Sequence, residues 1–212
     1  MKKVTKQKVE YLISRDIQNR KRNARKLYEM ALSGEKSNYV VSLDEAWIER
    51  KHGDTIRDHY YVRYGEKREE KIAQEVNESF PPKFMVVGAI CQSRTFPILK
   101  VPSSVTVNAQ YYVQYVLEPL IEKYIVPDFT DEVSKVIIHH DKATSHTANY
   151  TVNYIKNINK KYGISFSDKA DMPVKGTDIS PMDFFRFGYI KQGVKKSRAK
   201  TELGMWRKCQ EN

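Results

Sequence analysis

The chain has 212 residues, of which 40% are hydrophobic, 11% aromatic and 30% charged. A chain of this length and composition can bury a sizeable core, which excludes a disulfide-stapled miniprotein and wholesale disorder. Lysine and arginine outnumber aspartate and glutamate by 37 to 26, which gives a formal net charge of +11. This charge favours a polyanionic partner, with nucleic acid ahead of an acidic membrane surface.

Cysteine usage and hydropathy indicate the compartment. Cys91 and Cys209 lie far apart in sequence and form no spaced pair, as in proteins of a reducing compartment. No stretch approaches the roughly 20 apolar residues needed to cross a bilayer, and the first residues lack the apolar core of a signal peptide. We therefore expect a soluble intracellular protein without a membrane partner.

The first segment is predicted to be a basic amphipathic helix. Over residues 9–32 the apolar side chains stand mostly three or four apart, and Ser33 and Gly34 then end the pattern. Its polar face is a basic run of six cations: Arg15, Arg20, Lys21, Arg22, Arg25 and Lys26. These cations either follow the phosphates of a nucleic acid or form an ordinary solvated helix face.

Several strands are predicted next. Residues 39–43 form a short apolar strand that ends on an aspartate, and 59–63 is a second candidate. Residues 84–91 are an apolar run typical of a buried central strand, and 96–101 is its hairpin partner. These segments predict a sheet of at least three strands near the start of the domain.

Helices and one further strand follow. Residues 108–124 have helical spacing, and Pro127 is expected to close that helix. Residues 136–140 read as another buried strand. A helix over 144–160 then ends at Gly163. Strands, a crossover helix, a further strand and more helices predict an α/β or α+β sheet with helices packed on its faces.

The end of the chain is predicted to hold one more helix. Ser180 is a plausible N-cap and Pro181 suits the first helical position, so this helix runs through Tyr189. The tail from Lys195 is basic and weakly patterned.

Three aspartates occupy similar places in these elements. Asp44 ends the first strand, Asp141 ends the late strand, and Asp183 lies in the first turn of the last helix. Neighbouring strands would bring the first two together, and a helix at the same edge would add the third. Converging carboxylates repel one another unless Mg²⁺ or Mn²⁺ lies between them. Taken singly, each aspartate is equally well explained as a turn or helix cap.

Four blocks of the sequence carry a resemblance to a known family. They are SLDEAWI (42–48), FPPKFMVVGAI (80–90), IIHHDKATSHTA (137–148) and TDISPMDFFRFGYIK (177–191). In this order they resemble the successive blocks of mariner-type DNA transposases of the Tc/mariner superfamily. The resemblance implies an α/β, RNase H-like catalytic domain with a mixed central sheet and flanking helices over 37–190. It also implies a basic helical linker over 1–36 and a basic C-terminal tail over 191–212.

The resemblance also implies a catalytic site. Asp44, Asp141 and Asp183 match the family's three catalytic acids, which bind two divalent ions, Mg²⁺ or Mn²⁺. Asp178 is the nearest rival for the third position, but it matches a family aspartate that precedes the catalytic one. His146 matches a histidine that shapes the turn after the second acid.

One position departs from the family pattern. The family usually has asparagine directly after the second aspartate, where this chain has Lys142. An ammonium group there could pair with a carboxylate or a phosphate, or weaken cation binding by like-charge repulsion.

Activity and partners follow from the same resemblance. It implies metal-dependent DNA cleavage and strand transfer in the nucleus, with transposon ends and target DNA as partners, homodimer formation and no small-molecule cofactor. Family members carry two helix-turn-helix units before the basic segment on which this chain opens, so we expect the catalytic core without the element that selects its DNA. Phosphate contacts that carry little sequence information would remain. The candidates are Arg20, Arg22, Arg25, Lys26, Lys142, Lys191, Lys195, Lys196 and Arg198.

Two alternatives stay open. Lys142 and the absent front units favour a decayed or domesticated transposase remnant that binds nucleic acid or protein without cutting. Another RNase H-like nuclease, acting on RNA in hybrids, is the weaker alternative.

Overall fold

The computed structural model describes residues 13–29, 33–49, 81, 83–141, 143–167, 180–197, 199 and 201–211. The predicted strand 59–63 and the residues Lys142, Asp178 and Arg198 lie outside this part of the chain. Within it, five strands form one sheet in the order β3-β2-β1-β4-β5. The strands are β1 (Val40–Glu49), β2 (Lys83–Ile90), β3 (Leu99–Val101), β4 (Ile137–His139) and β5 (Ser165–Phe166).

The sheet is mixed. β2 runs antiparallel to both β1 and β3, which confirms the predicted hairpin of 84–91 with 96–101. β4 runs parallel to both β1 and β5. A parallel pair needs a crossover connection, and the helical segment 109–135 provides it between β2–β3 and β4.

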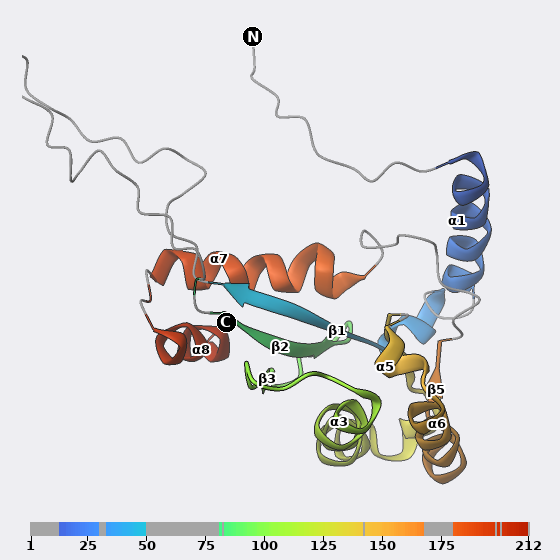
Figure 1. Cartoon of the computed structure of the whole chain (residues 1–212). Coiled ribbons are helices and arrows are strands. Elements are labelled where there is room, and N and C mark those ends of the chain that lie inside the picture. Colours follow the sequence, from blue (N-terminus) through green and yellow to red (C-terminus); the bar gives the residue numbers. More distant parts are fainter. Residues whose placement is uncertain are drawn as a thin grey trace, which may run out of the picture.

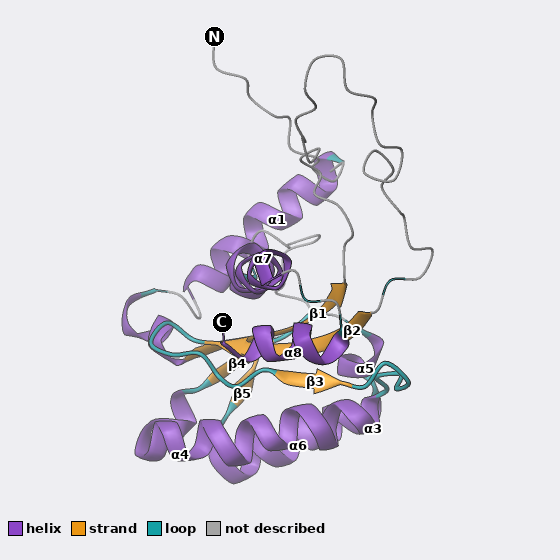
Figure 2. Ribbon diagram, turned by 90° about the vertical axis from the view of Figure 1, so that its left-hand side faces the viewer, coloured by secondary structure: helices purple, strands orange, loops and turns teal. Residues whose placement is uncertain are grey.

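Helices cover both faces of this sheet, as Figures 1 and 2 show. The helical elements are α1 (Ser14–Leu27), η2 (Gly34–Tyr39), α3 (Ala109–Tyr112), η3 (Val113–Leu117), η4 (Pro119–Ile125), α4 (Val126–Phe129), η5 (Thr130–Lys135), α5 (Thr144–Thr147), α6 (Asn149–Tyr162), η7 (Met182–Arg186), α7 (Phe187–Ser197) and α8 (Glu202–Glu211). The segment from α3 to α4 packs with α6 on one face, and η7, α7 and α8 pack on the other. Among these helices none is long and apolar enough to span a membrane.

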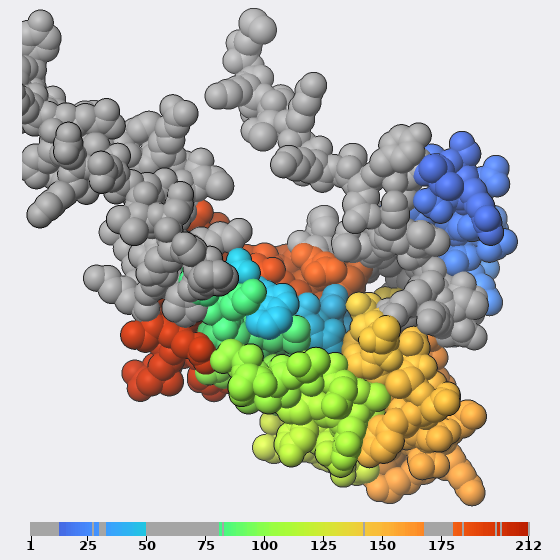
Figure 3. Space-filling view, in the orientation of Figure 1, coloured from blue at the N-terminus to red at the C-terminus, as the bar shows by residue number. Residues whose placement is uncertain are grey.

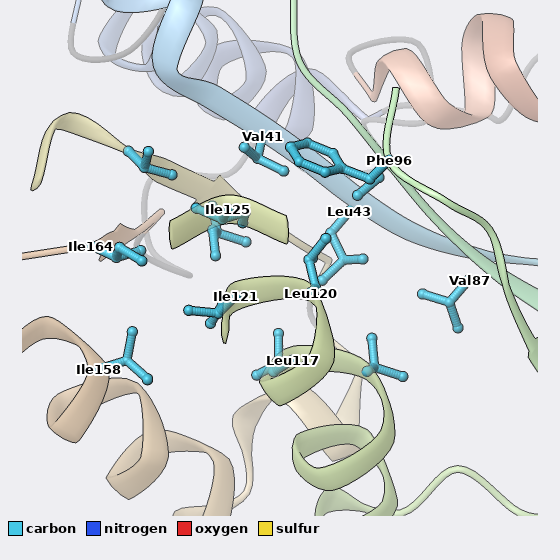
Figure 4. Close-up of a cluster of buried hydrophobic side chains, with 14 of the residues drawn as sticks. Val41, Leu43, Val87, Phe96, Leu117, Leu120, Ile121, Ile125, Ile158 and Ile164 are labelled. Atoms are coloured by element: carbon cyan, nitrogen blue, oxygen red, sulfur yellow. The ribbon is translucent and has the colours of Figure 1, made fainter. Parts of the chain in front are cut away.

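Strand β1 separates two hydrophobic cores because its side chains alternate between the faces. Val41 and Leu43 belong to the larger core, which also contains Leu117 and Ile121 of the long helical segment and Ile158 of α6 (Figure 4). On the opposite face Ala46 and Ile48 contribute to the smaller core. Its other buried members are Phe84, Val86, Met182, Phe187, Ile190, Val194, Met205 and Cys209.

The helices differ from prediction in three places. The helix predicted over 108–124 continues to residue 129, and Pro127 lies within it. Its turns in η3 and η4 are of the wider π type, and Pro127 lies where the π turns of η4 give way to the α turn of α4. The predicted helix 144–160 is divided into α5 and α6, because Ala148 is extended.

The last difference concerns the end of the chain. α7 continues past Tyr189 to Ser197, and the segment predicted to be weakly patterned contains α8. Met205 and Cys209, one turn apart on α8, are both fully buried in the smaller core.

A test of local strain is available at Gly163, which ends α6 with φ of +77°. A Cβ at this position would lie 2.7 Å from Cβ of Ser134, so alanine meets both the left-handed backbone and a steric clash. We expect Gly163→Ala to cost about 1–2 kcal/mol and to lower the melting temperature by roughly 2–8 °C. The control is Gly188→Ala in α7, where a Cβ meets nothing within 4 Å. Equal melting temperatures for the two variants would contradict this expectation.

Candidate active site

Asp44 lies inside strand β1, which corrects the prediction that this residue ends the strand. The strand continues to Glu49 because Ala46 and Ile48 keep burying one face after Asp44. Two neutral donors hold the Asp44 carboxylate: its Oδ1 accepts from the backbone N–H of Glu45 at 2.8 Å, and its Oδ2 accepts from the hydroxyl of Ser180 at 3.1 Å.

The electrostatics of Asp44 are unusual for an aspartate. Burial, followed by the negative charge of Asp183, raises the pKa of Asp44 to about 7, while its two hydrogen bonds act in the opposite direction. Asp183 therefore lies close enough for its negative charge to act on the carboxyl group of Asp44.

Asp183 lies in η7, the first turn of the helix that continues as α7. Met182 is fully buried and packs on Gly88, the residue paired with Asp44 on β2. A Cβ at Gly88 would lie 2.6 Å from Cε of Met182, so glycine permits the helix to approach the sheet this closely. Ser180 Oγ accepts from the backbone N–H of Asp183 at 3.4 Å, in agreement with its predicted capping position. One hydroxyl thus links the side chain of Asp44 to the backbone of Asp183.

Asp141 follows the end of β4, the parallel neighbour of β1. Ser42 pairs with His139, the last residue of β4, and Asp141 follows two residues later. Among the described residues, the carboxylate of Asp141 gathers with Glu45 and His146, not with Asp44 and Asp183. Oδ1 of Asp141 accepts from the backbone N–H of Ala143 at 2.9 Å and lies 2.7 Å from Nδ1 of His146. The hydrogen bond from His146 holds the pKa of Asp141 below its ordinary value.

His146 joins Asp141 to a second carboxylate. Its Nε2 lies 3.1 Å from Oε1 of Glu45, the residue that follows Asp44 in β1. Burial alone lowers the pKa of His146, but hydrogen bonds to Asp141 and Glu45 outweigh burial and raise the pKa to about 9. His146 is therefore an imidazolium at neutral pH, and both of its N–H groups donate to carboxylates.

Glu45, Asp141 and His146 also bring their ligand atoms within 4.8 Å of one another, a spacing compatible with one metal ion. A cation would have to displace a proton from the doubly hydrogen-bonded His146. The arrangement is better explained as a charged bridge between two carboxylates. Asp44 lies on the opposite face of β1, where the nearby acid is Asp183.

Two further aromatic rings enclose His146. The Tyr112 ring centroid lies 4.0 Å and the His140 centroid 4.9 Å from that of His146, and the two imidazoles are nearly parallel at 8°. The hydroxyl of Tyr112 lies 2.9 Å from Nδ1 of His140. Burial lowers the pKa of His140 to about 3 and raises that of Tyr112 well above its ordinary value, so neutral tyrosine donates to neutral histidine.

Glu45 is a site residue that was not predicted, and Ser180 was predicted only as a helix cap. Glu45 directly follows Asp44, so it points to the opposite face of β1, and this alternation was the available signal. The partner of Glu45 lies 101 residues away and that of Ser180 lies 136 residues away, so neither contact is visible locally.

The predicted phosphate-binding residues lie on two helices. Arg22, Arg25 and Lys26 are exposed on α1, and Arg25 forms an ion pair with Glu29 at 2.8 Å. Arg20 is half-buried on the same helix. Lys191, Lys195 and Lys196 are exposed on α7. The structure thus divides these cations between α1, at one end of the sheet, and the helix that begins beside Asp183 (Figure 1).

The strand order and the mixed pairing define an RNase H-like fold, as predicted. No protein-family model and no curated protein matches the sequence.

Solved structures show the same fold in the mariner transposase Mos1. The Mos1 paired-end complex with Mg matches with a TM-score of 0.74 at 20% identity, over 98% of this chain and 57% of that one. The paired-end complex with Mn gives 0.70 at 22% identity, over 100% and 63%. The isolated Mos1 catalytic domain gives 0.63 at 19% identity, over 94% and 89%. This chain therefore spans little more than half of the longer Mos1 chains and most of their catalytic domain.

Proposed function

We propose that this chain is the catalytic domain of a mariner-type DNA transposase, which cleaves transposon DNA and joins it to target DNA. One observation carries the proposal. In an RNase H-like sheet, the hydroxyl of Ser180 donates to the half-buried carboxylate of Asp44 and accepts from the backbone N–H of Asp183, so two acids from distant parts of the chain meet at one place. Burial and the negative charge of Asp183 both raise the pKa of Asp44. Two carboxylates that repel in this way gain stability from a bound cation. The likeness to Mos1 structures supports the same function.

The donors of the site suit Mg²⁺ or Mn²⁺. Asp44, Asp141 and Asp183 offer carboxylate oxygens, the ligands that hard divalent cations prefer. When bound, two such ions polarise a phosphodiester, activate the attacking oxygen and stabilise the leaving one. The chain itself holds the acids in place, through Ser180 for Asp44 and through His146 for Asp141.

The substrate follows from charge and from the relatives. The net charge of +11 attracts a polyanion, and the exposed lysines of α7 extend from the acids along one helix. Mos1 is seen in paired-end and strand-transfer complexes, which supports transposon ends and target DNA as partners and a homodimer as the working assembly.

Nicking of supercoiled plasmid DNA tests the proposal without knowledge of the transposon ends. We expect nicking with Mn²⁺ or Mg²⁺, none in EDTA, and none from Asp141→Asn. Asp131→Asn, which changes an exposed aspartate of η5, serves as the control and should nick like the wild type. Equal nicking in EDTA would exclude this mechanism.

A decayed remnant is the second candidate, because Lys142 stands where the family has asparagine. In that case the wild type should fail to nick DNA, and Lys142→Asn should bind Mn²⁺ more tightly than the wild type. Preference for RNA–DNA hybrids over duplex DNA in the same assay would instead indicate an RNase H-like nuclease of another kind.

A further inference from the structure

The bridge through His146 connects the second predicted acid to the strand that carries the first. His146 is 3% exposed and lies between Oδ1 of Asp141 and Oε1 of Glu45, at 2.7 and 3.1 Å. Glu45 is the immediate neighbour of Asp44 in β1. In Figure 3 the gold surface of α5, which carries His146, adjoins the blue surface of β1.

The imidazole of His146 is held in one orientation. Tyr112 and His140, which are 0% and 7% exposed, pack against it, and their mutual hydrogen bond of 2.9 Å fixes both rings. Rotation of His146 would break two hydrogen bonds inside a packed interior. The direction of its Nδ1–H is therefore set by the fold.

This direction determines how Asp141 is presented. His146 and the backbone N–H of Ala143 both donate to the same oxygen, Oδ1. Two donors on one oxygen fix the plane of the carboxylate, and with it the direction in which Oδ2 points. The side chain of Asp141 is 57% exposed, so packing alone does not orient it.

We propose that Glu45 is a positioning residue, which acts through His146 to orient the carboxylate of Asp141 for metal binding. The inference rests on the proposed function, since it takes Asp141 to be a metal ligand. Strand β1 then positions both acids. It carries Asp44 on one face, and Glu45 on its other face holds Asp141 in place through His146. His146 donates directly to Asp141, and direct partners of a metal ligand commonly affect metal affinity 10–100-fold. Glu45 lies one hydrogen bond further out.

Calorimetric titration with Mn²⁺ in the absence of DNA tests the inference. We expect Glu45→Ala to weaken Mn²⁺ binding roughly 10–100-fold. Glu45→Gln, which still accepts from His146, should retain affinity within about 5-fold of the wild type. The matched control is Glu49→Ala at the exposed end of the same strand, which should bind as the wild type does.

A double variant separates positioning from a general loss of stability. His146→Phe keeps an aromatic ring against Tyr112 but removes both hydrogen bonds. If Glu45 acts through His146, the double variant Glu45→Ala/His146→Phe should bind Mn²⁺ no more weakly than His146→Phe alone. Melting curves recorded alongside should show all variants folded at the titration temperature.

The possible outcomes are distinct. Mn²⁺ binding by the wild type with unchanged affinity in Glu45→Ala overturns the inference and leaves the proposed function standing. Additive losses in the double variant overturn it as well. Absence of Mn²⁺ binding by the wild type and by Lys142→Asn alike removes the proposed function, and the inference with it.

Discussion

Replacing Asp183 by asparagine should reduce metal-dependent DNA cleavage on the order of 1000-fold, the upper range for losing one group that stabilises transition-state charge. Asparagine keeps the shape of the side chain but offers a neutral oxygen, which is a weaker ligand for a hard cation. The fold should be unharmed. Asp183 is exposed, its backbone N–H still reaches Ser180, and loss of its charge relieves Asp44. We therefore expect loss of activity without loss of stability.

Two variants complete this measurement. Asp178→Asn tests the rival third acid and should retain nicking within a few-fold. Asp128→Asn removes an exposed charge paired with Arg94 and controls for the change in net charge. An inactive Asp178→Asn beside an active Asp183→Asn would transfer the third ligand position to Asp178.

Periodicity predicted most of the sheet and its helices. The hairpin of β2 with β3 was visible because the apolar run 84–91 and the segment 96–101 lie close in sequence. The length of β1 was missed because Asp44 interrupts the apolar run, although Ala46 and Ile48 continue its alternation. α8 was missed because only Met205 and Cys209, one turn apart, are buried in a segment that is otherwise exposed or half-buried.

The candidate site was only partly accessible from sequence. The three aspartates could be named because their blocks resemble a family, and because acids at strand ends and first helical turns are recognisable. Their surroundings could not be named. The contact of His146 with Glu45 depends on the sheet order, in which β4 lies next to β1. The contact of Ser180 with Asp44 depends on the packing of η7 against β1 and β2. Such tertiary contacts leave no periodic signal in the sequence.

The stability of the metal-free protein should fall as pH rises from about 4 to about 7, with Asp44 as one cause. Its pKa in the folded state is about 7, compared with an ordinary value of 3.8. Between these values the unfolded chain releases the proton while the folded chain retains it, so rising pH favours unfolding. This difference in pKa corresponds to a change of about 4 kcal/mol in the free energy of unfolding. Because Asp44 is partly exposed, solvent screening reduces this change to about 2 kcal/mol.

Asp44→Asn removes the destabilising carboxylate charge. This variant should be more stable than the wild type at pH 8, by about 2 kcal/mol or roughly 4–8 °C in melting temperature. Near pH 4 the difference should vanish, because the wild-type carboxyl is then protonated in the folded state. Asp131→Asn, which removes an equal charge from the surface, should show no such dependence. Saturating Mg²⁺ should stabilise the wild type but not Asp44→Asn, since a ligand that binds only the folded state shifts unfolding by mass action. An unchanged difference between the two proteins from pH 4 to 8, with and without Mg²⁺, would show that Asp44 is neither strained by burial nor a ligand.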